Sequence, residues 1–118
     1  MKTRPSIPNA EIFDATKQLE QFQNSTLRPI IKSLNDLLLV YFQNYMVMKK
    51  FDNLNSTAIQ KDAFITTAFL KDHPFKNEIK GFIIGHFSIE EYDFYKNYTK
   101  QINKRIFNIL QQRILSFQ

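Results

Sequence analysis

The sequence predicts an all-α fold, a single helical bundle of about five helices, on three observations. The 118 residues are 43% hydrophobic and include 12 Phe and 5 Tyr, a composition too apolar and too aromatic for a disordered chain. Only 2 Gly and 4 Pro are present, so long segments are free of helix breakers. Apolar residues recur three and four positions apart along most of the chain, which is the period of amphipathic helices. A chain of this length fits one domain.

The first quarter of the chain is expected to contain a tail and one short helix. Residues 1–8 hold two prolines and are expected to form a flexible N-terminal tail, which leaves residues 9–118 as the helical-bundle domain. Asn9 is a candidate N-cap, and the apolar spacing after it predicts a helix over about residues 10–24. The phrase NSTLRP at residues 24–29 combines cap residues with a proline, which favours a break between two helices; one kinked helix is the alternative.

A long central helix is predicted at about residues 27–49. Its main apolar stripe is widened by Ile30, Leu37 and Phe42, so this helix is expected to have neighbours on two sides. Leu39, Val40 and Met46 are surplus apolar positions outside the stripe, which favour a surface that a partner covers. The stripe itself follows a heptad-like spacing and consists of Leu27, Ile31, Leu34, Leu38, Tyr41, Tyr45 and Met48.

Two shorter helices are expected after a loop at residues 49–57. Asn55 or Ser56 is the candidate cap of the first. Its predicted buried face consists of Ile59, Ala63, Thr66 and Phe69 or Leu70. Asp72 and Pro74 suit the cap and the first turn of the second helix. The apolar stripe of that helix consists of Phe75, Ile79, Phe82 and Ile83, with His86 at its end.

The second long helix is predicted at about residues 89–116. Ser88 and Glu91 have the spacing of a capping box, in which each side chain accepts a hydrogen bond from the backbone N–H of the other residue. Acidic residues follow the cap and basic residues come later, an order that complements the helix dipole. We expect this helix to pack antiparallel to the one that starts near Leu27.

His86 is the first candidate functional residue. Its place on an apolar stripe predicts a half-buried imidazole that hydrogen-bonds a backbone carbonyl or the next helix cap. A metal site needs several converging ligands, and His86 could share a helix face with Glu90 and Asp93 only if the helix ran unbroken through Ser88. The capping box argues against that, so the sequence predicts no metal site and no cofactor.

Gly81 and Gly85 form a G-x-x-x-G pattern within the fourth predicted helix. Such a pattern allows another helix backbone to approach closely. We expect it to support packing against a helix of the same chain, with a homodimer contact or a ligand cleft as alternatives.

The formal net charge of +5 raises the question of nucleic-acid binding. Lys96, Lys100 and Lys104 are spaced four residues apart on the last predicted helix, with Arg105 beside them, and could contact phosphates or an acidic partner. Other lysines are scattered and arginine is scarce, so a solvated helix face is the favoured explanation of the pattern.

Several classes of protein are disfavoured by what the chain lacks. It has no cysteine for a disulfide framework, a thiolate metal site or a cysteine nucleophile, and it shows no G-x-S-x-G, H-E-x-x-H or cofactor motif. Its longest apolar runs fall far short of the ~20 residues that span a bilayer. The first 14 residues lack the continuous apolar core of a secretory signal. We therefore expect a cytoplasmic protein that is not an enzyme and does not enter a membrane.

Three phrases resemble a family of short bacterial proteins. They are FQNSTLRPIIKSLNDLLL at residues 22–39, IIGHFSIEEYDFYKN at residues 83–97 and NKRIFNILQQRI at residues 103–114. The family is all-helical and without an assigned activity, and some members carry the label glyoxalase. Metal-dependent glyoxalases are built from β-α-β-β-β modules with ligands on strands, whereas the helical periods here predict no strands. The resemblance implies a helical fold and transfers no functional residue.

The function that the sequence favours is a small helical protein-interaction or self-associating module, whose partner is an unidentified protein or a second copy. A basic nucleic-acid-binding helical protein is the alternative. An enzyme or a metal site around His86 is the least favoured hypothesis.

Overall fold

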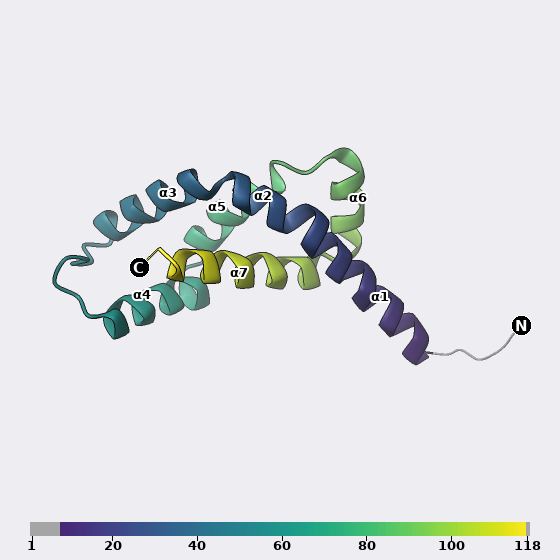
Figure 1. Ribbon diagram of the computed structural model, residues 1–118, viewed down its shortest axis with the longest axis horizontal. Helices are drawn as coiled ribbons and strands as arrows, with labels where there is room; N and C mark the ends of the chain where they lie inside the picture. Colours follow the sequence, from purple (N-terminus) through teal and green to yellow (C-terminus); the bar gives the residue numbers. More distant parts are fainter. Residues whose placement is uncertain (1–7, 118) are drawn as a thin grey trace, which may run out of the picture.

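The computed structural model describes the backbone of residues 8–117 and the side chains of residues 14–117. The regular elements of this part of the chain are all helical, which confirms the all-α prediction there (Figure 1). They are α1 (Pro8–Phe22), the π-helical turn η1 (Gln23–Leu27), α2 (Arg28–Ser33), α3 (Asn35–Met48), α4 (Ala58–Lys71), α5 (His73–Ile84), α6 (Ile89–Asn97) and α7 (Thr99–Leu115). The predicted tail lies outside the described residues, except for Pro8, which begins α1 in place of the expected cap at Asn9.

The break predicted at residues 24–29 is absent, because α1, η1 and α2 form one continuous rod. The backbone stays right-handed helical at Phe22 and at Arg28, the residues that flank η1. Pro29 cannot donate a backbone hydrogen bond, and its ring would collide with the carbonyl four residues earlier in an α-helix. A wider turn relieves this conflict: the Arg28 N–H donates to the Gln23 carbonyl, five residues back. Counting this rod once, the described residues form six helices, one more than predicted.

The two predicted long helices are each interrupted. Leu34 leaves the helical region, with φ −96° and ψ 10°, and Ser33 Oγ donates to the Ile30 carbonyl oxygen over 2.6 Å. Tyr98 likewise separates α6 from α7, with φ −136°, and Thr99 Oγ1 donates to the Tyr95 carbonyl oxygen over 3.2 Å. Hydroxyl side chains that bond backbone carbonyls in this way compete with the helix and bend it. The predicted helices at 27–49 and 89–116 were therefore too long.

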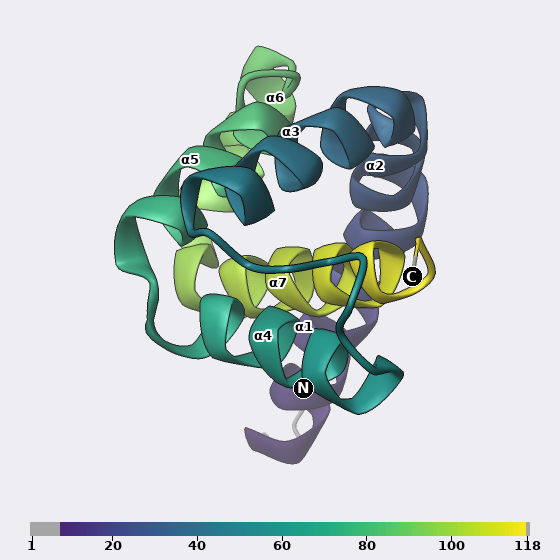
Figure 2. The same cartoon turned by 90° about the vertical axis from the view of Figure 1, so that its left-hand side faces the viewer.

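Helix α7 lies in the middle of the bundle, flanked by α2, α3, α4 and α5 (Figure 2). Arg105 Nη1 donates to Gln23 Oε1 over 2.7 Å, and Arg113 Nη1 donates to Asn35 Oδ1 over 3.3 Å. From Arg105 to Arg113 along α7, the bonded partner also moves forward along the chain, from Gln23 to Asn35. Helix α7 therefore runs parallel to η1 and α2, and not antiparallel as predicted. The three intervening helices α4, α5 and α6 carry the chain back to the starting end, and α4 is the element that runs antiparallel to α7 (Figures 1 and 2).

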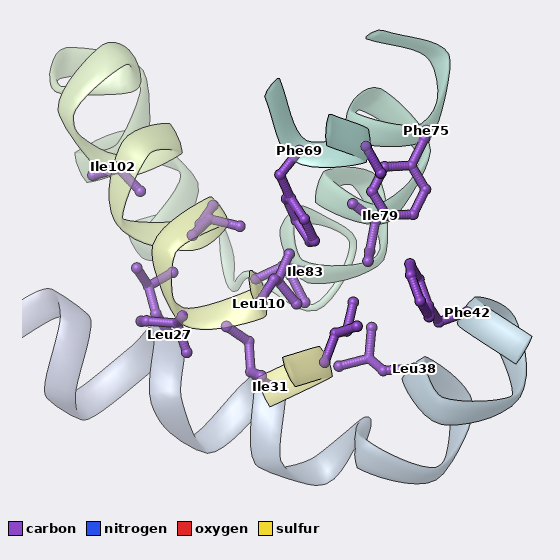
Figure 3. Close-up of a cluster of buried hydrophobic side chains, with 14 of the residues drawn as sticks. Leu27, Ile31, Leu38, Phe42, Phe69, Phe75, Ile79, Ile83, Ile102 and Leu110 are labelled. Atoms are coloured by element: carbon purple, nitrogen blue, oxygen red, sulfur yellow. The ribbon is translucent and has the colours of Figure 1, made fainter. Parts of the chain in front are cut away.

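The core joins side chains from the rod, α3, α4, α5 and α7, which point toward one another (Figure 3). Its largest fully buried side chains are Phe42, Leu27, Ile31, Leu38, Ile65, Ile79, Ile83, Ile102, Ile106, Leu110 and Ile114. The N-terminal end of α1 projects away from the bundle (Figure 1). The other end of α1 packs against α6 and the connection before it. The Phe22 ring centroid is 5.6 Å from that of Phe87 in the connection and 5.0 Å from that of Phe94 in α6.

Of the three helix starts predicted after the rod, two are confirmed and one is wrong. Ser88 and Glu91 form the expected capping box at α6, and Asp72 accepts from the Phe75 N–H at the start of α5. The cap of α4 is Thr57, which forms a capping box with Gln60. Asn55 and Ser56 both bond Asp52 instead and shape the preceding loop.

The predicted buried face of α4 is confirmed at Phe69 and wrong at the other predicted positions, since Ala63 and Thr66 are also exposed. The residues that α4 buries are Ile65, Ala68 and Phe69, whereas Ile59 is 82% exposed and Leu70 is 66% exposed. Both sets of positions have helical spacing, so periodicity alone does not choose between them. Contact with α5 and α7 decides which face of α4 is buried.

Candidate functional site

His86 is exposed and lies in the connection between α5 and α6, not half-buried as predicted. Its Nδ1–H donates to the Phe82 carbonyl oxygen over 2.9 Å, which confirms the expected bond to a backbone carbonyl. Because α5 ends before His86 and α6 begins after it, Glu90 and Asp93 do not share a continuous helix with this histidine. Across the described residues, no group of three or more His, Asp or Glu side chains could hold a metal ion.

The two glycines do not mediate helix packing within the chain. Gly81 is exposed, and a Cβ placed there would have nothing within 4 Å. A Cβ on Gly85 would meet only the Gly81 and Phe82 carbonyl oxygens of its own helix, at 3.1 and 3.8 Å. The expectation of internal packing is therefore wrong, and a contact with a second molecule remains a proposal.

The basic residues predicted as one stripe lie on two helices. Lys96 belongs to α6, whereas Lys100, Lys104 and Arg105 belong to α7, beyond the break at Tyr98. Lys96 Nζ lies 2.8 Å from the carboxylate of Asp93, and this hydrogen bond raises the pKa of the Lys96 ammonium. Arg105 is half-buried and bonds Gln23, so its guanidinium holds α7 against η1. Only Lys100 and Lys104 are left as exposed members of this set without such a bond.

One side of α3 exposes apolar side chains, which we call the α3 strip. It consists of Leu37, Val40, Val47 and Met48, which are 48%, 60%, 73% and 72% exposed. Their spacing places them on one half of the helix. Of the apolar positions expected to need extra neighbours, Met46 enters the core and Leu39 is half-buried, while Val40 joins the strip.

A groove between α3 and α5 adjoins the α3 strip, and Met48 belongs to both. We call it the α3–α5 groove. Its cavity has a volume of about 240 Å³ and is lined by Tyr41, Asn44, Tyr45, Met48, Lys49, Asp72, Pro74, Phe75 and Glu78. Three aromatic rings form its apolar wall: the centroids of Tyr41 and Phe75 are 6.0 Å apart, and those of Tyr45 and Phe75 are 4.4 Å apart.

Two tyrosine–carboxylate hydrogen bonds connect the helices across the groove. The Tyr41 hydroxyl donates to Glu78 Oε1 over 2.7 Å, and the Tyr45 hydroxyl donates to Asp72 Oδ2 over 2.6 Å. Burial, followed by these bonds, raises the pKa of both tyrosines, and the Tyr45 hydroxyl lowers the pKa of Asp72. At neutral pH the hydroxyls therefore remain protonated donors and Asp72 remains negatively charged.

A lysine side chain already lies at one end of the groove. Lys49 Nζ is 3.4 Å from Asp72 Oδ2 and 5.7 Å from the centroid of the Tyr45 ring. Glu78, at the other end, is exposed and has no ion-pair partner among the described side chains. The groove thus holds two carboxylates and one ammonium group.

This groove could not be predicted from the spacing of apolar residues in the sequence. Tyr41 and Tyr45 were assigned to a core stripe, and their partners lie about 30 residues later in the chain. One signal was available: a tyrosine at core spacing needs a hydrogen-bond partner for its hydroxyl. The acidic residues around Phe75 were candidate partners, but the sequence does not tell which of them lies opposite each tyrosine of α3.

Comparison of the chain with protein-family models, with curated proteins and with solved structures found no match. The resemblance to a family of short helical bacterial proteins therefore remains a prediction. Among the helices of residues 8–117, none combines the length and the apolar character needed to cross a bilayer.

Proposed function

We propose that this protein is a small helical interaction module that binds a protein partner, or a second copy of itself, through the α3 strip. The observation that supports this proposal is the exposure of Leu37, Val40, Val47 and Met48 along one half of α3. Exposed apolar patches next to polar residues are typical of protein-interaction surfaces. Full burial of one such side chain contributes about 1.5–3 kcal/mol, so a partner covering several of them would be held with useful affinity.

The α3–α5 groove supports the same proposal, because it extends the strip into a concave surface with aromatic walls. Aromatic side chains in pockets at the centre of an interface often contribute most of the binding energy. The nucleic-acid alternative has weaker support, since Lys96 and Arg105 are engaged within the chain.

A matched pair of double variants tests the proposal. Val40→Glu/Val47→Glu places two charges on the α3 strip, and Leu54→Glu/Ile89→Glu places two charges at positions that are 94% and 88% exposed elsewhere. Each tagged protein is used for capture from lysate of the native host, with and without nuclease. Light scattering over a range of concentrations measures self-association of each protein in parallel.

We expect the strip variant to lose the nuclease-resistant partner, or the dimer, while the control variant retains it. Equal capture and equal mass for both variants would contradict the proposal. Recovery of material only without nuclease would instead favour the nucleic-acid alternative.

A further inference from the structure

The Glu78 end of the α3–α5 groove presents a carboxylate with spare hydrogen-bonding capacity. Glu78 uses Oε1 to accept from the Tyr41 hydroxyl, and its side chain is otherwise exposed. The rings of Tyr41 and Phe75 lie beside it with centroids 6.0 Å apart and planes only 21° from parallel. A carboxylate next to aromatic faces attracts organic cations, because the ring quadrupole and the negative charge act together.

The opposite end of the groove contains an example of this recognition from within the chain. The Lys49 ammonium lies near the Tyr45 ring and near Asp72, as a cation between an aromatic face and a carboxylate. Glu78 and Tyr41 repeat that pairing of carboxylate and tyrosine about two helical turns away along α5. Among the described side chains, no ammonium or guanidinium group forms an ion pair with Glu78 or lies over the Tyr41 ring.

We propose that the α3–α5 groove binds an arginine or lysine side chain of the partner that covers the α3 strip, with the cationic group between Glu78 and the half-buried ring of Tyr41, which packs on the buried Phe75. This inference rests on the proposed function and names the chemistry of the partner. A guanidinium fits best, since it stacks on aromatic faces and donates to a carboxylate in one plane. The apolar stem of the same side chain would extend from this pairing toward Met48, which lines the groove and belongs to the strip.

The test is a titration followed by two-dimensional NMR of the backbone amides at low ionic strength. The probe is N-acetyl-L-arginine N-methylamide, and the matched control is the corresponding citrulline derivative, which has the same shape without the charge. We expect saturable shifts at the amides around Tyr41, Tyr45 and Glu78 with the arginine probe, weakened by added salt. Equal shifts from both probes, or shifts that map outside the groove, would overturn the inference.

Two variants of exposed groove residues and one control variant sharpen this test. Glu78→Gln removes the charge and should weaken the arginine probe about three- to fivefold, whereas Glu90→Gln on α6 should leave its affinity unchanged. Lys49→Gln removes the competing ammonium and should tighten binding about two- to fivefold. An unchanged affinity in Glu78→Gln would count against the site.

A second probe distinguishes the source of the cation. Free L-arginine carries an α-ammonium and a carboxylate that a residue within a protein lacks. If it binds more than about tenfold tighter than the blocked residue, the groove recognises a free amino acid and the inference about a partner protein fails.

The inference and the proposed function can fail separately. If Val40→Glu/Val47→Glu loses its partner while the arginine probe does not bind, the interaction module stands and the cation site is wrong. If the probe binds while the strip variant keeps every partner, the proposed function is wrong, and with it the assignment of the cation to a partner.

Discussion

The helices α3 and α7 have similar lengths, 14 and 17 residues, but they use their apolar side chains differently. In α7 the five isoleucine and leucine residues from Ile102 to Ile114 are buried. In α3 only Leu38, Phe42 and Met46 are buried, while the four residues of the α3 strip stay exposed. The difference follows from position, because α7 has helices on several sides and α3 lies at the edge of the bundle (Figure 2). The fold thus leaves no large apolar side chain of α7 exposed, since Phe107 and Leu115 pack partly buried against the core, whereas it leaves four exposed on α3.

The largest expected contrast is in core stability. Ile106 is fully buried on α7, so Ile106→Ala should lower the free energy of unfolding by about 2–5 kcal/mol, through lost burial and the cavity left behind. Urea denaturation measures this value. A cost below about 1 kcal/mol would mean that α7 is not the centre of the core.

The next contrast concerns the side of α3 that faces α5, where the Tyr45 hydroxyl forms a hydrogen bond with the charged Asp72 carboxylate. Tyr45→Phe removes the donor to Asp72 and should cost about 1–2 kcal/mol at pH 7. The folded-state pKa of Asp72 is lowered, so its contribution is present above the unfolded pKa of about 3.9 and is lost as the pH falls through the lower folded value. The difference between variant and wild type should therefore shrink below about pH 4, as chemical denaturation at several pH values would reveal. A difference that grows on acidification would contradict this assignment.

A smaller effect is expected at the polar edge of α7. Arg105→Gln removes the hydrogen bond from Arg105 to Gln23, which joins α7 to η1, at a cost of about 0.5–1.5 kcal/mol. Thermal unfolding measures the shift, and Lys104→Gln on the exposed side of the same helix serves as the control. Equal shifts for both variants would show that Arg105 acts only through its charge.

The smallest effect is expected on the α3 strip. Val47 is 73% exposed, so Val47→Ala should change the free energy of unfolding by no more than about 0.5 kcal/mol. The same substitution should still weaken partner capture if the strip is an interface. A large loss of stability in the isolated protein would mean that Val47 supports the fold, and the contrast between α3 and α7 would then disappear.

Local signals predicted the fold class and several helix starts. The capping box at Ser88 and the cap at Asp72 followed from neighbouring residues alone, because both depend on side chains three residues from the bonded backbone. The interruptions at Leu34 and Tyr98 were missed, since the apolar period continues across them. Ser33 and Thr99 offered a signal there, but hydroxyl groups within helices do not always bond the backbone.

The features that depend on tertiary structure could not be derived from spacing. The buried face of α4 and the direction of α7 depend on which helices meet in the bundle. The exposure of His86 and the open surroundings of Gly81 follow from the same arrangement. Predicting the α3–α5 groove requires the register between the two helices, and that register depends on the packing of Phe75 against both tyrosines.

The projecting end of α1 has a consequence for hydrodynamic behaviour. The described molecule measures 64 × 29 × 22 Å, and its radius of gyration is 17.4 Å. A compact domain of this length would have a radius of gyration of about 13–14 Å. Friction with the solvent rises with elongation, so a single chain diffuses more slowly and elutes from a sizing column earlier than its mass implies. A monomer of this protein would therefore resemble a dimer by elution volume, and its mass has to be measured by a method that is independent of shape.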